Sequence, residues 1–219
     1  MSGGARRVRR LARGAAACVL ATACHGGSTE LRDYLLIDDP PAPDAPAPDA
    51  PKPKGDLAAV RVRPLVARSF LDHAEIAWRQ GDVLAGAYRW HRWSEPPAEM
   101  VTHAWVEALR SGGRFAAVDN GASRPSAPFT LSGELLGFHE LTDADGSHPR
   151  GVVEVEVTVE REPRDGASAL HQVVRASKSV DAADDTVDAL VRALSEATRQ
   201  AVAELARAAE EAVAGAASR

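Results

Sequence analysis

Strict alternation of apolar and polar residues marks the middle of the chain. Valine occupies every second position of residues 153–159, with glutamate or threonine between, so one face of a strand is buried and the other is solvated. Residues 129–142 predict a long neighbouring strand, and the turn residues at 143–146 join the two as a hairpin. Gly133 and Gly137 in that neighbour indicate a bulge or a close approach of two backbones.

Shorter extended segments lie on both sides of this hairpin. Gln80–Asp82 and Arg164–Gly166 carry turn residues, which places a chain reversal at each. The expected strands are Leu57–Leu65, Glu75–Arg79, Val83–Trp93, Phe115–Val118 and Ala169–Val180.

The first of two helical patterns follows the aromatic strand. Ser94 is the expected N-cap, with Pro96 and Pro97 in the first turn. The Gly112–Gly113 pair ends the helix. Its apolar face is formed by Val101, Ala104, Ala108 and Leu109.

The second pattern is a long helix with Asp184 or Asp185 as the expected cap. An apolar stripe follows it in steps of three and four, through Val187, Leu190, Leu194, Ala197, Ala201, Leu205 and Ala208. Few large apolar residues remain after Ala206, so we expect a frayed end there rather than a contact with a partner helix. Together the elements predict one α+β domain, a largely antiparallel or mixed sheet with two main helices packed on one face.

Residues 1–23 have the features of a secretory signal peptide. Five arginines and no acid precede Gly14–Ala23, an apolar stretch far shorter than the ~20 residues that span a bilayer. The small residues before Cys24 form a lipobox-like sequence, which makes Cys24 the expected lipid attachment site and residues 24–33 the lipidated N-terminus. Lipidation at Cys18, cleavage without lipidation, and a basic start without a targeting role are the alternatives.

Charge excludes one class of partner. Removing residues 1–23 takes away five of the 26 basic residues and none of the 31 acidic ones, which leaves a net charge of −10. So acidic a domain is a poor binder of phosphate groups, which argues against nucleic acid and against broad adhesion to anionic lipid.

Residues 38–54 are a low-complexity run with a proline at every second or third position. This composition cannot form a helix or a central strand, and it favours an extended spacer. A tether between the lipid and the domain is the simplest interpretation, and a PxxP ligand for a partner domain is the alternative.

The sequence contains no motif for catalysis or cofactor binding. It lacks GxSxG, GxGxxG and GxxxxGK[ST], and the acidic turn at 143–146 has no later glutamate at calcium-loop spacing. No two histidines form an HxH or HxxxH pair beside an acidic ligand, which argues against zinc. The seven are His25, His73, His91, His103, His139, His148 and His171. We therefore expect no enzyme activity, no metal and no cofactor.

The most unusual segment is residues 88–97, in which aromatic and basic residues alternate. Simple alternation places Tyr88, Trp90 and Arg92 on one strand face and Trp93 on the other. One interpretation is a core seam, with Trp90 and Trp93 packed under a helix. The other is a partner interface formed by Tyr88, Trp90, Arg92 and Trp93, because aromatic residues and arginine are enriched where proteins bind each other.

Several short motifs, in order and at close spacing, resemble the ABC-type transport auxiliary lipoprotein family of the PqiC/YmbA type. They are Phe70-Leu71-Asp72, Ile76-Ala77-Trp78-Arg79, Tyr88 through Pro97, Leu109–Val118 (LRSGGRFAAV) and, as the family's first strand, Tyr34-Leu35-Leu36. On this resemblance the domain spans residues 34–206, and 207–219 is the Ala-rich end of the last helix. The proline-rich run then becomes a loop inserted between a first strand at Tyr34–Ile37 and a second at Leu57–Leu65.

The resemblance implies a fold like the anticodon-binding or TolB N-terminal type. It also implies partners: an MCE-domain protein and an ABC permease with its ATPase, which move lipids or other hydrophobic molecules between two membranes. The lipoprotein would dock this assembly at the periplasmic face of the outer membrane rather than at the inner membrane. A stand-alone envelope lipoprotein that itself binds an apolar ligand is the alternative function, and self-association into a homo-oligomer stays open.

Overall fold

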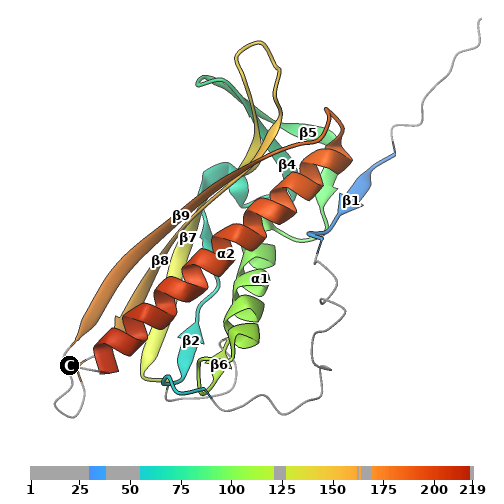
Figure 1. The fold of residues 1–219 in the computed structure, drawn as a ribbon. Coiled ribbons are helices and arrows are strands. Elements are labelled where there is room, and N and C mark those ends of the chain that lie inside the picture. The colour runs from blue at the N-terminus through green and yellow to red at the C-terminus, as the bar shows by residue number, and fades with distance from the viewer. Residues whose placement is uncertain (1–29, 38–54, 121–126, 162, 164–168, 218–219) are drawn as a thin grey trace, which may run out of the picture.

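The computed structural model describes residues 30–37, 55–120, 127–161, 163 and 169–217. Over these residues a mixed sheet carries two helices on one face, which makes an α+β fold (Figure 1). None of the described helices is long and apolar enough to cross a membrane. The expected signal peptide, Cys24, the proline-rich run and the turn at 164–166 lie outside the described residues.

Three long antiparallel strands form the regular part of the sheet. They are β7 (Phe129–Thr142), β8 (Arg150–Arg161) and β9 (Leu170–Asp181). Strand β8 pairs with β9 along its whole length, and its alternate valines are buried in the core. The period-two pattern therefore predicted these strands correctly, and β7 begins and ends where the sequence placed it.

Both glycines of β7 have the expected roles. The pairing of β7 with β8 shifts register between Leu135 and Gly137, which is a β-bulge. A Cβ added at Gly133 would lie 2.2 Å from the carbonyl oxygen of Glu156, so glycine is needed where these two backbones approach.

Shorter strands extend the sheet on the other side of β7. Strands β4 (Glu75–Gln80) and β5 (Leu84–Trp93) form an antiparallel hairpin, and β4 runs parallel to β7. The others are β1 (Arg32–Tyr34), β2 (Val60–Val62), β3 (Val66–Ala67) and β6 (Val118–Asp119). The order is β1-β5-β4-β7-β2-β6, with β8 and β9 on the opposite edge of β7.

Two expected strands are shorter than the sequence pattern suggested. The segment 57–65 contributes only β2, because Pro64 has no N–H to donate and separates β2 from β3. The segment 115–118 contributes an isolated bridge between Leu57 and Phe115 and the first residue of β6. Strand β1 includes Tyr34 but ends there, so the first strand lies earlier than 34–37.

Helix α1 (Pro97–Gly112) ends as predicted but begins differently. Gly113 adopts a left-handed conformation, with φ of 66°, and its N–H caps the carbonyl of Arg110. The N-cap is Pro96, without a side-chain hydrogen bond, so the prediction of Ser94 as the cap is wrong. The Ser94 N–H instead donates to the carbonyl oxygen of Tyr34, 2.8 Å away. A contact distant in sequence therefore decides the role of this serine.

Helix α2 (Val187–Ala217) is capped by neither predicted aspartate. The Thr186 hydroxyl accepts a hydrogen bond from the N–H of Ala189 at 3.2 Å, which is the geometry of an N-cap. Asp184 holds this cap in place by accepting from the N–H of Thr186 at 2.9 Å. The acid thus supports the cap and does not form it.

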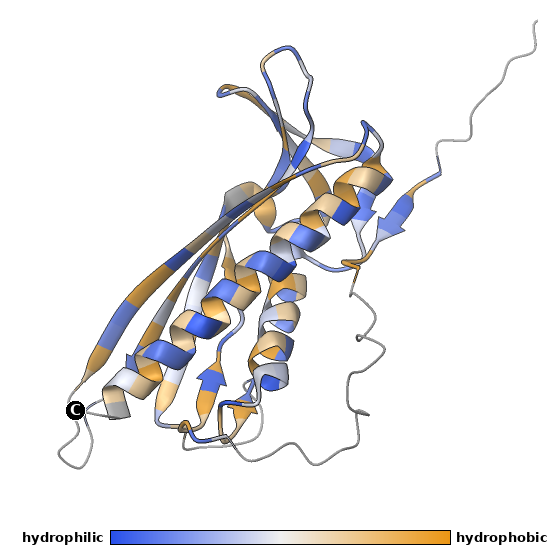
Figure 2. Ribbon diagram, in the orientation of Figure 1, coloured by the Kyte–Doolittle hydropathy of each residue, from blue (hydrophilic) through white to orange (hydrophobic). Residues whose placement is uncertain are grey.

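The expected fraying of α2 after Ala206 is wrong. The helix remains regular to Ala217. Its full length is 31 residues, about 46 Å at 1.5 Å per residue, and it lies along the strands of the regular part (Figure 1). Its last three turns bury Ala209, Ala212, Val213 and Ala216. Hydrophobic and hydrophilic residues alternate along it in Figure 2, as expected of a helix with one buried face.

Small residues bring α2 close to the sheet. A Cβ added at Gly151 of β8 would lie 2.6 Å from the backbone nitrogen of Leu194, so this strand and the helix backbone are in direct contact. An ion pair between Lys178 of β9 and Glu204 joins the same two layers at the surface. The core lies between the sheet and both helices, and its largest side chains are Trp93, Trp105, Phe138, Leu71, Ile76, Leu109, Leu131 and Leu135.

Candidate functional site

The aromatic segment lies in β5, at the edge of the sheet where β1 is added. Strand β1 pairs with β5 in parallel, with Arg32 opposite His91 and Tyr34 opposite Trp93. The Tyr34 hydroxyl lies 3.0 Å from Nδ1 of His91, at hydrogen-bond distance. Burial is the main cause that raises the pKa of Tyr34 above its ordinary value. The first strand is therefore attached to the domain through this segment.

A large bulge interrupts β5 between Ala87 and Arg92. On β4, only Ile76 separates the partners of these two residues, whereas four residues of β5 lie between them. The bulge turns Tyr88 toward the core, where its hydroxyl donates to Glu140 Oε2 at 2.6 Å. Burial, and then the nearby Glu140 carboxylate, raise the pKa of Tyr88.

The structure separates the two tryptophans of this segment. Trp93 is 1% exposed and packs edge-on against Phe138, with ring centroids 5.2 Å apart. Trp90 is 41% exposed. The core-seam interpretation is confirmed for Trp93 and wrong for Trp90, which lies on the opposite strand face, as simple alternation predicts.

The bulge also changes the partner interface that the sequence suggested. Arg92 is exposed, and its Nε donates to Asp33 Oδ1 of β1 at 2.6 Å. This bond raises the pKa of Arg92. Trp93 is buried and Tyr88 is half-buried, so Trp90 and Arg92 are the members of the set that a partner can reach directly.

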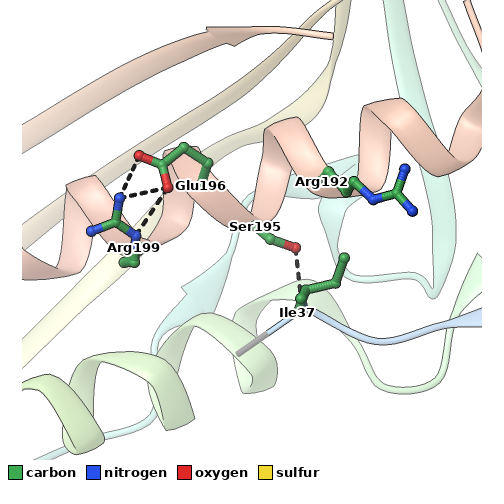
Figure 3. Close-up of a pocket in the computed structure, with 5 residues that line it drawn as sticks. All are labelled: Ile37, Arg192, Ser195, Glu196 and Arg199. Carbon is green, nitrogen blue, oxygen red and sulfur yellow. Dashed lines mark hydrogen bonds and ion pairs between the residues drawn. The ribbon is translucent and has the colours of Figure 1, made fainter. Parts of the chain in front are cut away.

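After β1 the chain crosses to α2. The N–H of Ile37 donates to the Ser195 hydroxyl at 3.0 Å, and that hydroxyl donates in turn to the carbonyl of Val191. An open hollow of about 250 Å³ lies here, and Figure 3 shows the residues that border it, among them Arg192, Ser195, Glu196 and Arg199. Glu196 is bound by Arg199, which lowers the pKa of the carboxyl group. The contact holds Ile37, the last described residue before the proline-rich run, against α2, and no sequence motif indicated it.

A more apolar hollow lies on the β4–β5 hairpin. It has a volume of about 560 Å³ and is open to solvent. Alanines and a glycine form its floor, at Ala77, Ala85, Gly86 and Ala87, and its walls are Phe70, His73 and Glu75. This composition suits an apolar contact and offers few groups for chemistry.

The described residues contain no group of three or more His, Cys, Asp or Glu side chains that could hold a metal ion. The most perturbed histidine is His139 on β7, which is buried. Burial, followed by the charge of Arg79, lowers its pKa to about 4, while Glu154 opposes the shift. His139 is therefore neutral at physiological pH, and it sits between β4 and β8.

Sequence comparison identifies the family of the domain. The family model described as "ABC-type transport auxiliary lipoprotein component" matches residues 34–206. The chain belongs to this family. A lipoprotein component of ABC-type transport belongs to the cell envelope, and the family is described as a transport component, not as an enzyme. No curated protein sequence matches the chain.

Solved structures with little sequence identity share the fold of this auxiliary lipoprotein. A crystal structure of a protein from Xanthomonas campestris matches with a TM-score of 0.63 and 18% identity, over 80% of this chain and 94% of that one. A structure of an uncharacterized protein matches with a TM-score of 0.56 and 19% identity, over 72% and 94%. At such identities the likeness concerns the fold alone.

Proposed function

We propose that this auxiliary lipoprotein is the lipid-anchored docking component of an intermembrane transport system. The system would contain an MCE-domain protein and an ABC permease with its ATPase, and it would move lipids or other hydrophobic molecules. The family match over residues 34–206, directly after a lipobox-like sequence, carries the proposal. The family is described as a transport component, which supports a role in binding and assembly.

In this proposal the membrane anchor is a lipid on Cys24, which holds the domain at the periplasmic face of the outer membrane. Two or more acyl chains give stable attachment, at about 0.8 kcal/mol per buried methylene. His25 follows the cysteine, without the aspartate that retains lipoproteins at the inner membrane. Palmitate labelling in cells should disappear in Cys24→Ala and persist in Cys18→Ala. The reverse result would move the anchor to Cys18.

For the docking surface we propose Trp90 and Arg92, at the edge formed by β1 and β5. Exposed tryptophan and arginine are the residues most often found at the energetic centre of protein interfaces. The neighbouring N-terminal segment adds Leu31, Leu35 and Ile37, which are about half exposed. The surface therefore lies where the chain coming from the lipid joins the fold.

A photo-crosslinking amino acid at Trp90 tests the docking surface and the partner together. We expect ultraviolet light to link the Trp90 variant to an MCE-domain protein in intact cells. The matched control places the same amino acid at Val173, which is 52% exposed on β9 at the opposite edge of the sheet. Equal capture from both positions would contradict the surface, and capture of only unrelated envelope proteins would contradict the partner.

The apolar hollow on the β4–β5 hairpin favours a second function, the binding of an apolar ligand by the lipoprotein itself. Its volume of about 560 Å³ is in the range of small-molecule sites, although it is open rather than enclosed. Native mass spectrometry of the intact protein should then detect a bound lipid, and Ala87→Asp in the floor should remove it. Spectra without bound lipid would eliminate this function.

A further inference from the structure

The β4–β5 hairpin carries apolar side chains that the fold leaves uncovered. At its tip, Val83 is 90% exposed and Leu84 is 53% exposed, while Phe70 beside the hairpin is 49% exposed. We call Phe70, Val83, Leu84, Ala85 and Ala87 the apolar hairpin surface. Figure 2 shows hydrophobic colour at this tip, next to a hydrophilic β7–β8 tip.

The apolar hollow makes this surface continuous. Alternation along β4 places Ala77 on the sheet face opposite to Ile76, where Ala77 is buried, at 4% exposure, and its partner Ala87 is exposed. Gly86 cannot carry a side chain, because its Cβ would lie 2.5 Å from the Trp78 indole. The surface therefore runs from the tip along a smooth floor of small residues to the Phe70 ring.

The first described residues lead toward the same end of the sheet. Strand β1 runs parallel to β5, so the residues before Arg32 lead toward the end of β5 that carries the tip. Cys24 precedes Glu30 by six residues, which is at most about 20 Å of extended chain. The stretch of β5 from Leu84 to His91 has a comparable length, at about 3.3 Å per residue. The chain before Arg32 is therefore long enough for a lipid on Cys24 to reach as far along the sheet as the hairpin tip.

The charges near the tip select the kind of membrane surface. Asp82 adjoins Val83, and the turn with Asp143 and Asp145 lies alongside, since the Gln80 side chain donates to the carbonyl of Ala144. Asp143 is paired with Arg150. The other two acids, Asp82 and Asp145, are repelled by anionic headgroups, which favours contact by apolar insertion into zwitterionic lipid.

We propose that the apolar hairpin surface inserts into the interface of the membrane that holds the Cys24 lipid, with zwitterionic phospholipid as its partner. The inference rests on the proposed lipidation of Cys24. The hairpin is then a second membrane contact, and the two contacts together fix the orientation of the domain on the bilayer. A lipid alone would leave the domain free to rotate.

Fluorescence quenching in vesicles tests the insertion. The full lipidated protein is placed in vesicles of phosphatidylethanolamine and phosphatidylcholine, some of which carry a nitroxide on the acyl chain. An environment-sensitive dye is attached in the Val83→Cys variant, or in the control Ala203→Cys on the exposed face of α2. Once Cys24 is in thioether linkage, the introduced thiol is the single labelling site. We expect a blue shift and severalfold stronger quenching at position 83 than at position 203.

A second substitution separates insertion from proximity. Leu84→Asp should abolish quenching of the dye at position 83, whereas Val173→Asp, at an equally exposed position on β9, should leave it unchanged. Absent or equal quenching at positions 83 and 203, with palmitate labelling intact, would overturn the proposal. A blue shift confined to native envelope membranes, and missing in pure lipid, would assign the surface to a protein and also overturn it. Loss of palmitate labelling on the unsubstituted chain would instead refute the anchoring on which the inference rests.

Discussion

The two parts of the sheet are built by different rules. In the regular part, β7, β8 and β9 are long and antiparallel, and α2 lies along them while the β7–β8 tip extends beyond it (Figure 1). In the part formed by β1, β4 and β5, the strands are shorter, and β1 and β4 each run parallel to one neighbour. The bulge in β5 is also larger than the one in β7. The exposed tryptophan and the apolar hairpin surface both lie in this second part. Periodicity therefore specifies the scaffold, and departures from periodicity create the surfaces available for binding.

The largest expected effect tests whether the irregular part shares the core of the regular part. Trp93→Ala should lower the free energy of unfolding by about 3–5 kcal/mol, because removing a fully buried indole that packs on Phe138 leaves a cavity. Urea unfolding of the mature chain measures it. The control Trp90→Ala should change the free energy by less than about 1 kcal/mol. Similar losses in both variants would mean that Trp90 belongs to the core as well.

The stability of the junction between the two parts, where His139 of β7 lies between β4 and β8, should fall at acidic pH. The folded pKa of His139 is about 4, below the ordinary value of 6.5, so the unfolded chain binds a proton more tightly. The full stability is present above pH 6.5, and up to about 3 kcal/mol is lost as the pH falls to 4. His139→Gln should flatten this part of the pH profile, measured by thermal unfolding. The exposed His171→Gln should keep the slope, and equal slopes in His139→Gln and the unsubstituted chain would remove His139 as the cause.

A smaller effect tests the end of α2. Val213→Ala should lower the free energy of unfolding by about 2 kcal/mol, since Val213 is buried in the last turns of the helix. Glu211→Ala, on the exposed side of the same turn, should have almost no effect. Chemical denaturation compares the two variants. A frayed end would leave both without effect.

The smallest effect concerns the start of α2. Thr186→Ala removes the acceptor for the Ala189 N–H and should cost about 1 kcal/mol. Asp185→Asn should change stability much less, because Asp185 makes none of the capping bonds at this end. Thermal unfolding of the two variants decides between the observed cap and the one that the sequence suggested. The reverse order would restore Asp185 as the cap.

Much of the fold could be predicted from the sequence where neighbours in the chain determine the structure. The valine alternation of β8, the limits of β7 and the glycine that ends α1 are all local signals, and the structure confirms them. The role of Ser94 could not be predicted in this way, because its N–H binds the carbonyl of Tyr34, sixty positions earlier. The alanines at the end of α2 were also misjudged, because a small side chain can be fully buried where a helix lies close to a sheet.

The candidate site depended even more on distant contacts. Four residues of β5 lie opposite one residue of β4, and nothing in the order of aromatic and basic residues indicates this mismatch. It separates Tyr88 from Trp90 and Arg92, with which simple alternation grouped it, and directs the Tyr88 hydroxyl toward Glu140. The sequence pattern predicts Val83 and Leu84 as ordinary strand residues and does not indicate that they are exposed, because a hydrophobic residue at a tip has the same pattern as one in a core.

The position of α2 has a consequence for the order in which this domain folds during export. The Ile37–Ser195 hydrogen bond joins residues 158 positions apart, and α2 supplies the cover for β7, β8 and β9. A chain that emerges N-terminus first through a translocation channel presents all its strands before it presents this helix. Until then the valines of β8 have no partner layer. On the proposed export route, the complete core therefore forms only after α2 has also emerged.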